Sequence, residues 1–164
     1  VPHPTRNTAA YVAPISEQLK SRPRRFTQLQ YECYCIAREM IGLVDPDYAS
    51  GEYIVQFAYM NSKAHYVKVH TDNHDISYQY VLTLGDFAGA SLRAYLSKDR
   101  SSYLDFATIG SFVKVDGRHP HEVILSPNFR GDRFTCIWYK NYDRRKRRDD
   151  AILKTPYVVN EAML

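Results

Sequence analysis

Short runs of apolar or alternating residues, separated by polar turn residues, occupy the middle of the chain. They predict strands over residues 53–60, 65–70, 78–84, 91–96, 111–115, 121–126 and 134–140. No helical pattern long enough for a parallel crossover lies between these runs, so the strands are expected to pair mainly antiparallel. The pattern favours a double-sheet jelly roll, although a closed barrel or an immunoglobulin-like sandwich would produce similar runs.

An amphipathic helix is predicted ahead of the strands. Apolar residues recur three and four positions apart from Gln28 to Met40, Thr27 can cap the first turn, and the pattern stops at Gly42. This helix is expected to back a sheet. Residues 1–26 are rich in proline and have no sustained period, so they are interpreted as an N-terminal arm.

Composition supports one mainly β domain. The chain has 164 residues, and its fourteen Tyr and seven Phe against one Trp suit pleated strands. The expected class is therefore mainly β (α+β), a double-stranded β-helix or jelly roll with the N-terminal helix packed on the major sheet. The predicted domain covers residues 27–142, with its core at 53–142, and a basic extension covers 143–164.

Charge and cysteine content say less about function. Much of the formal charge of +4 comes from two basic runs, at 22–25 and 144–148, which can attract phosphate but are more often solvated surface. Three cysteines without framework spacing argue against a disulfide scaffold. Neither a signal peptide nor a membrane span is visible, so the protein is expected to be soluble and intracellular, either cytoplasmic or nuclear.

The first candidate for chemistry is His70-Thr71-Asp72, at the end of a predicted strand. Residues two apart face the same side of a strand, so His70 and Asp72 can present an imidazole and a carboxylate to one point. His121, at the start of a later strand, can supply a third ligand. Two histidines and one carboxylate on one face, with open positions opposite, are the arrangement of non-haem iron(II) oxygenases.

Other histidines compete with this set. His119 would share a strand face with His121, but the intervening Pro120 and the following Glu122-Val123 favour His121 as the ligand. His74, in the loop after Asp72, could touch a substrate, although a plain surface role is commoner for such a residue.

A second element, Arg133-Phe134-Thr135, follows His121 in a predicted strand. A guanidinium offers a planar fork of donors to a carboxylate, and a hydroxyl two residues along the same face can add a bond. Such a pair can hold the distal carboxylate of 2-oxoglutarate. The structural alternative for Arg133 is an ion pair with a nearby aspartate.

The order of these elements resembles the iron(II)- and 2-oxoglutarate-dependent dioxygenases with a double-stranded β-helix core. The matching phrases are His70-x-Asp72, then YVLTLGDFxG at 80–89, GRxPHEV at 117–123 and GxRFxxIWY at 131–139. The phrase Leu84-Gly85-Asp86-Phe87 looks most like the branch around the TET/JBP nucleic-acid hydroxylases, and it also occurs in prolyl-hydroxylase-like members. Gly89-Ala90 departs from the Gly-Gly often seen there.

The resemblance implies a role for each matching residue. His70, Asp72 and His121 would bind Fe(II), Arg133 would pair with the C5 carboxylate of 2-oxoglutarate, and Thr135 would assist. Tyr59 or Asn61 would touch the co-substrate. The implied activity is hydroxylation with O2, releasing succinate and CO2.

Several substrates and one other function class stay open at this point. The substrate could be a nucleic-acid base, which the two basic runs would suit, or a prolyl or other residue of a protein. The rival class is a cupin-like jelly-roll module that binds a metal or ligand without oxygen chemistry, but such a module has no need of Arg133 and Thr135.

Overall fold

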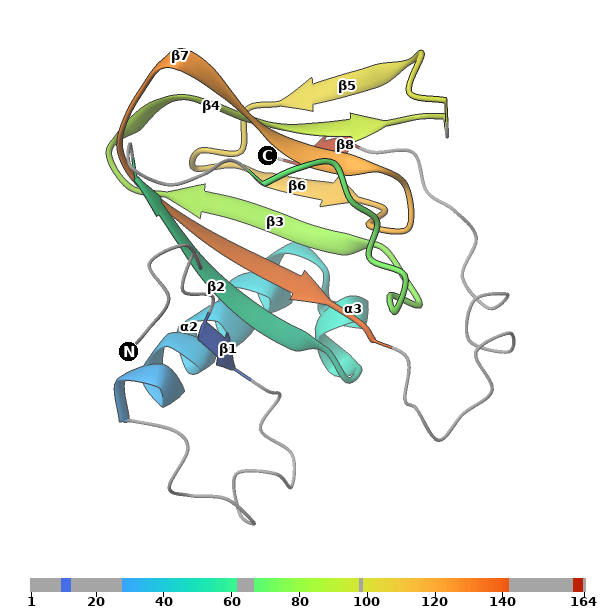
Figure 1. The fold of residues 1–164 in the computed structure, drawn as a ribbon. Coiled ribbons are helices and arrows are strands. Elements are labelled where there is room, and N and C mark those ends of the chain that lie inside the picture. The colour runs from blue at the N-terminus through green and yellow to red at the C-terminus, as the bar shows by residue number, and fades with distance from the viewer. Residues whose placement is uncertain (1–9, 13–27, 62–66, 98, 142–160, 164) are drawn as a thin grey trace, which may run out of the picture.

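The computed structural model describes residues 10–12, 28–61, 67–97, 99–141 and 161–163. Thr27, both basic runs and most of the predicted arm and extension lie outside these residues. Figure 1 shows two helices against a strongly bent antiparallel β structure. The elements are α2 (Gln28–Val44), α3 (Pro46–Ser50), β1 (Ala10–Val12), β2 (Ile54–Asn61), β3 (Gln79–Leu84), β4 (Phe87–Tyr95), β5 (Tyr103–Phe106), β6 (Phe112–Val115), β7 (His121–Tyr139) and β8 (Glu161–Met163).

Strand β7 joins two layers. Its C-terminal half lies between β2 and β3 in a sheet ordered β1-β2-β7-β3-β6-β8, and its N-terminal half pairs with β4, which in turn pairs with β5. All of these pairings are antiparallel. In Figure 1, β7 crosses the upper layer, turns at one edge and returns in the lower layer. The expected mainly β, antiparallel class is confirmed.

Two glycines allow the bend. Gly131 in β7 has φ +90°, and a Cβ there would lie 2.0 Å from the carbonyl oxygen of Asp86. Gly85, between β3 and β4, has φ +116°, and its Cβ would lie 2.2 Å from the carbonyl oxygen of Asp132. Only glycine fits such close backbone crossings at positive φ. The bend of β7 and the turn from β3 to β4 therefore lie side by side, where both segments pass from one layer to the other.

The structure corrects three strand predictions. The runs at 121–126 and 134–140 belong to one strand, β7. Between them, Arg130 and Gly131 resume the pairing with β4 after a break in the register, and Asp132 begins the pairing with β2. In the run at 65–70, the described residues make only an isolated bridge from His70 to His121. Strand β5 was not predicted, since three of its four residues are exposed at an edge and carry no apolar alternation.

Helix α3 was also not predicted, because its sequence, Asp45-Pro46-Asp47, is typical of a turn. Asp45 caps the helix by accepting a bond from the backbone N–H of Tyr48 at 2.8 Å, and Pro46 occupies the first turn, where no amide hydrogen is needed.

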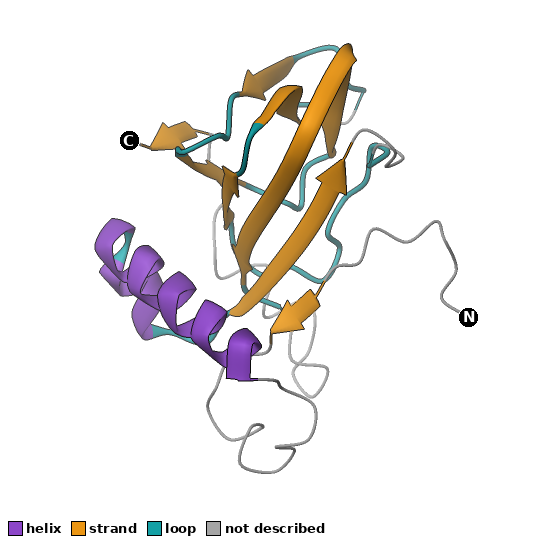
Figure 2. Cartoon of the chain, turned by 90° about the vertical axis from the view of Figure 1, so that its left-hand side faces the viewer, coloured by secondary structure: helices purple, strands orange, loops and turns teal. Residues whose placement is uncertain are grey.

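Both helices pack on one side of the larger sheet, as predicted for the N-terminal helix (Figure 2). The indole N–H of Trp138 in β7 donates to the carbonyl oxygen of Ala37 in α2 at 3.0 Å. Ile41 and Trp138 are completely buried in the resulting core. The face of the sheet that points away from the helices lines an internal cavity. Neither helix has the length and apolar character needed to cross a membrane.

Replacing Asp45 with alanine should lower the free energy of unfolding by about 2–3 kcal/mol, the sum expected for a lost cap and a lost charge-assisted hydrogen bond. Besides capping α3, the Asp45 carboxylate accepts a 2.6 Å bond from the hydroxyl of buried Tyr80. Chemical denaturation measures the change, and Asp47→Ala in the same helix is the control, expected within about 0.5 kcal/mol.

The effect of Asp45 should depend on pH. Burial tends to raise the pKa of Asp45, but the bonds from Tyr80, Tyr48 and Tyr78 hold it below its ordinary value. A carboxyl with a lowered pKa in the folded state stabilises the protein above its ordinary pKa and loses that contribution as pH falls. The difference between native chain and variant should therefore shrink below about pH 4; a constant difference would contradict this account.

Candidate metal centre

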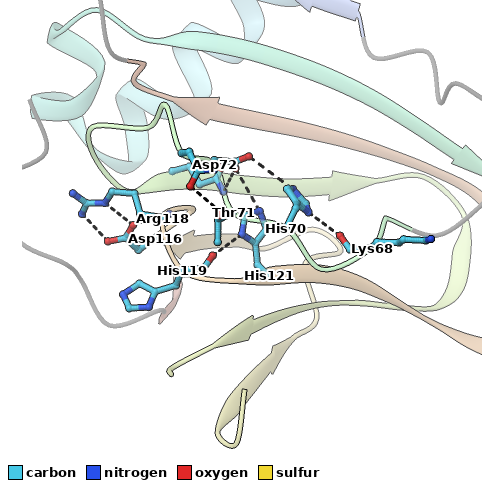
Figure 3. A network of polar contacts seen from close by, with 10 residues as sticks. Lys68, His70, Thr71, Asp72, Asp116, Arg118, His119 and His121 are labelled. Carbon is cyan, nitrogen blue, oxygen red and sulfur yellow. Dashed lines mark hydrogen bonds and ion pairs between the residues drawn. The ribbon is translucent and has the colours of Figure 1, made fainter. Parts of the chain in front are cut away.

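His70, Asp72 and His121 come together beside the first residues of β7. His70 and His121 form an isolated antiparallel bridge, with N–H to carbonyl distances of 3.0 and 2.9 Å in the two directions. The backbone N–H of Asp72 donates to the carbonyl oxygen of Gly117 at 2.7 Å. Backbone bonds thus hold the loop that carries two candidate ligands against the strand that carries the third (Figure 3).

The side chains of the three residues converge. One ligand atom from each of them lies within 4.8 Å of the others. The Nε2 atom of His121 is 3.4 Å from one oxygen of Asp72, and the Nε2 atom of His70 is 3.8 Å from the other. His70 is exposed while His121 is buried, so the cluster opens to one side. This geometry suits a single cation with open coordination positions.

Both imidazoles are oriented by backbone carbonyls. The Nδ1 atom of His70 lies 2.9 Å from the carbonyl oxygen of Lys68, and that of His121 lies 3.0 Å from the carbonyl oxygen of His119. A neutral imidazole that donates from Nδ1 has a lone pair on Nε2, which is the atom a metal requires. In both histidines Nε2 is the nitrogen that faces Asp72.

Charge within the cluster favours an ionised carboxylate. Burial acts to raise the pKa of Asp72, but hydrogen bonding and the charge of His121 hold it below its ordinary value. Burial acts to lower the pKa of His121, but the bond to Asp72 raises it above its ordinary value. In the absence of a metal, the Asp72 carboxylate therefore favours the protonated form of His121.

The cluster lies in a cavity of about 540 Å³ that also contains Arg133 and Thr135. Arg133 is only 4% exposed, and its Nη1 donates to the hydroxyl of Thr135 at 2.7 Å. The fold therefore brings the three candidate ligands and the R-x-T element into one cavity. The two ends of one bent strand meet in the same cavity, although twelve positions separate His121 from Arg133.

No carboxylate pairs with Arg133 among the described residues. Burial alone lowers the pKa of Arg133 to about 10, with no acidic group acting on it, and its Nε atom has no partner. An ion pair with a nearby aspartate, the structural alternative for this residue, is not found. A buried guanidinium without a counter-charge is costly, and an anionic ligand would offset that cost.

Tyr59 and Asn61 are placed differently from Arg133. Tyr59 lies opposite Phe134 in the register of β2 and β7, and its hydroxyl donates to Asp132 at 2.5 Å, while Asn61 donates to that hydroxyl at 3.0 Å. Met60 is the residue opposite Arg133 and shares its face. The register does not bring Tyr59 and Asn61 to Arg133, and their contact with a co-substrate stays a prediction.

Of the competing histidines, His119 contributes its carbonyl oxygen to His121 but is not in the cluster of ligand atoms. His74 is exposed and lines the cavity. His65 lies outside the described residues.

Sequence reasoning missed Gln79 and Gly117. The side chain of Gln79 donates from Nε2 to Asp72 at 3.3 Å. At Gly117, a Cβ would lie 2.9 Å from oxygens of both Asp72 and Asp75. Burial, with the charges of Asp72 and Asp116, raises the pKa of Asp75 to about 8. The Gly-Arg phrase at 117–118, which belongs to the family resemblance, could have drawn attention to Gly117. A glutamine at the start of a strand belongs to no such pattern, so nothing in the sequence was a reason to select Gln79.

Solved structures share this architecture. A prolyl-4-hydroxylase from Pseudomonas putida matches over 82% of this chain and 68% of its own, with a TM-score of 0.50 and 15% identity. The chain has the double-stranded β-helix fold. The predicted resemblance to the iron(II)/2-oxoglutarate-dependent dioxygenase superfamily is thus confirmed at the level of fold, and the His-Asp-His cluster fits it.

Other comparisons add less. A 2OG-Fe(II) oxygenase family oxidoreductase from Burkholderia pseudomallei matches with a TM-score of 0.45 and 21% identity, over 58% of this chain. The chain spans about half of that protein, 49%. No protein-family model and no curated protein matches the sequence.

The residues of this β-helix fit a metal and a dicarboxylate. Two Nε2 atoms and one carboxylate would suit iron(II) as a donor set. Arg133 in the same cavity has no acidic partner among the described residues and suits a ligand carboxylate. A metal-binding module without co-substrate would not account for that arginine.

Proposed function

We propose that this protein is an iron(II)- and 2-oxoglutarate-dependent oxygenase that hydroxylates its substrate and releases succinate and CO2. The observation that carries the proposal is the presence, in one cavity, of a His-Asp-His cluster and a buried arginine that has no acidic partner within the described part of the chain. A cupin-like binding module would need only the first of these.

The chain's own residues would bind and orient the reactants. His70, Asp72 and His121 would hold the metal, while Arg133 and Thr135 would bind the far carboxylate of 2-oxoglutarate. When bound, the iron, with the co-substrate and O2, supplies the oxidising power that converts C–H to C–OH. Apolar cavity residues exclude water from the reactants, namely Val81, Leu92, Val123 and Ile137.

Succinate formation from 2-oxoglutarate tests this function. The protein is loaded with iron(II) without air and mixed with 2-oxoglutarate and oxygen, and succinate is measured by NMR. Slow turnover is expected even without the substrate. Saturating 2-oxoglutarate should also raise the melting temperature, corresponding to about 2.7 kcal/mol at a hundred times its Kd. A folded, metal-loaded sample that shows neither effect would favour the binding module.

We propose that the substrate is an amino-acid residue of a protein rather than a nucleic-acid base. The support for this choice is the fold neighbour from P. putida, which is a prolyl-4-hydroxylase. The nucleic-acid alternative rests on the Leu84-Gly85-Asp86-Phe87 phrase and the two basic runs of the sequence. Succinate formation stimulated by a proline-containing peptide would support this choice. If an oligonucleotide stimulates succinate formation and the peptide does not, and if oligonucleotide binding weakens steeply as the salt concentration rises, the substrate is a nucleic acid.

Metal binding should weaken in acid. His121 must lose its Nε2 proton to bind a metal, and its pKa lies above the ordinary value near 6.5. The affinity for the metal should therefore fall as the pH is lowered below about 7, because protons then compete with the metal for Nε2 of His121. Co(II) titrations between pH 8 and pH 5.5 measure the effect. A pH-independent affinity would show that the metal binds elsewhere.

A further inference from the structure

Gln79, the first residue of β3, is a buried polar residue of the cavity with a contact to the metal cluster. Its side chain is only 4% exposed, and it lies opposite Val115 in the register of β3 and β6. A buried side-chain amide needs a hydrogen-bond partner. The partner here is a candidate metal ligand, since Gln79 Nε2 donates to Asp72 Oδ2 at 3.3 Å.

Gly117 provides the space for this contact. A Cβ at position 117 would lie 2.6 Å from Gln79 Nε2 and 2.9 Å from Asp72 Oδ2, so any larger residue would push the two groups apart. The carbonyl oxygen of Gly117 also accepts the backbone N–H of Asp72. The Asp72 residue is therefore held at its backbone by Gly117 and at its carboxylate by Gln79.

The two oxygens of Asp72 have different neighbours. Oδ2 accepts from the Gln79 amide and lies 3.4 Å from His121 Nε2, whereas Oδ1 lies 3.8 Å from His70 Nε2. We propose that Gln79 is a positioning residue, which holds the Asp72 carboxylate in the orientation that turns one oxygen toward each histidine and so presents the carboxylate to the metal. The inference rests on the proposed function, because it assumes that Asp72 is a metal ligand.

Hydrogen bonds to ligating groups commonly change metal affinity 10- to 100-fold when they are removed. Gln79→Met keeps the length of the side chain and removes the donor. We expect it to bind Co(II), used in place of air-sensitive iron(II), at least about 10-fold more weakly than the native chain. The visible absorption of bound Co(II) should also change, because a carboxylate released from Gln79 no longer keeps its orientation toward the two histidines.

Gln56→Leu is the matched control. Gln56 is a glutamine of the same cavity wall, on β2, and the change removes an amide without touching the triad. Its Co(II) affinity and spectrum should equal those of the native chain. If Gln79→Met does not fold, Gln79→Glu keeps the shape but replaces the donor with an oxygen beside Asp72, and it too should change the Co(II) spectrum.

The outcomes separate this inference from the proposed function. A native chain that binds no Co(II) overturns both. A native chain that binds Co(II), with a Gln79 variant of the same affinity and spectrum, overturns only the role of Gln79. A variant with a lower melting temperature but native metal binding would show that the glutamine is merely structural.

Discussion

Replacing Asp72 with alanine is expected to weaken metal binding on the order of 10²–10³-fold and to abolish succinate formation. Asp72 is the only carboxylate in the cluster, and it faces the Nε2 atoms of both His70 and His121. Its negative charge offsets that of a divalent cation, which two neutral imidazoles cannot do. Isothermal titration with Co(II), followed by the succinate assay at saturating metal, measures both effects.

His119→Ala is the control for this experiment. It removes an imidazole close to the cluster but keeps the backbone carbonyl that orients His121 through Nδ1. Metal affinity should then stay within about threefold of the native value, because no ligand and no orienting group is lost. If His119→Ala abolished binding while Asp72→Ala retained it, the ligand assignment would be wrong.

Replacing Arg133 with leucine should have two opposite effects. The Kd for 2-oxoglutarate is expected to rise by about 10²-fold or more, since a desolvated charge pair is worth roughly 2–5 kcal/mol. The protein without ligands should become more stable by about 1–3 kcal/mol, because the variant no longer buries a cation that lacks a counter-charge. Metal affinity should be unchanged, since Arg133 is not in the triad.

Calorimetry with 2-oxoglutarate and thermal unfolding of the ligand-free protein measure the two effects. Arg130→Leu, an exposed arginine on the same strand, is the control and should change neither quantity appreciably. Arg133→Lys should recover part of the affinity, as it keeps the charge but loses the planar fork. A loss of stability in Arg133→Leu together with native 2-oxoglutarate affinity would assign the arginine a purely structural role.

Strand alternation explains only part of the site. Arg133 and Thr135 are two residues apart in β7, and both side chains are buried in the cavity, as alternation predicts. His70 and Asp72 lie in a loop, and backbone hydrogen bonds to His121 and Gly117 hold them in place. The register of β2 against β7 places Met60 opposite Arg133, while Tyr59 also lines the cavity. The contact of Tyr59 or Asn61 with a co-substrate stays a prediction.

Strand limits were harder to predict for a related reason. The runs predicted at 121–126 and 134–140 stop on either side of a stretch that forms the bend of one continuous strand and is exposed at most positions. Apolar alternation reports burial and not hydrogen bonding, so an exposed stretch of paired backbone has no apolar pattern. The edge strand β5 escaped prediction in the same way.

The amino-acid sequence by itself determined the mainly β class, the backing helix and the identity of the candidate ligands. These depend on local periodicity and on the chemistry of side chains a few residues apart. Only the tertiary structure decided that the triad and Arg133 share one cavity and that Gln79 bonds to Asp72. Such contacts join residues distant in the chain, so they depend on how the strands are paired and on the bend of β7 between two layers, which Gly131 permits.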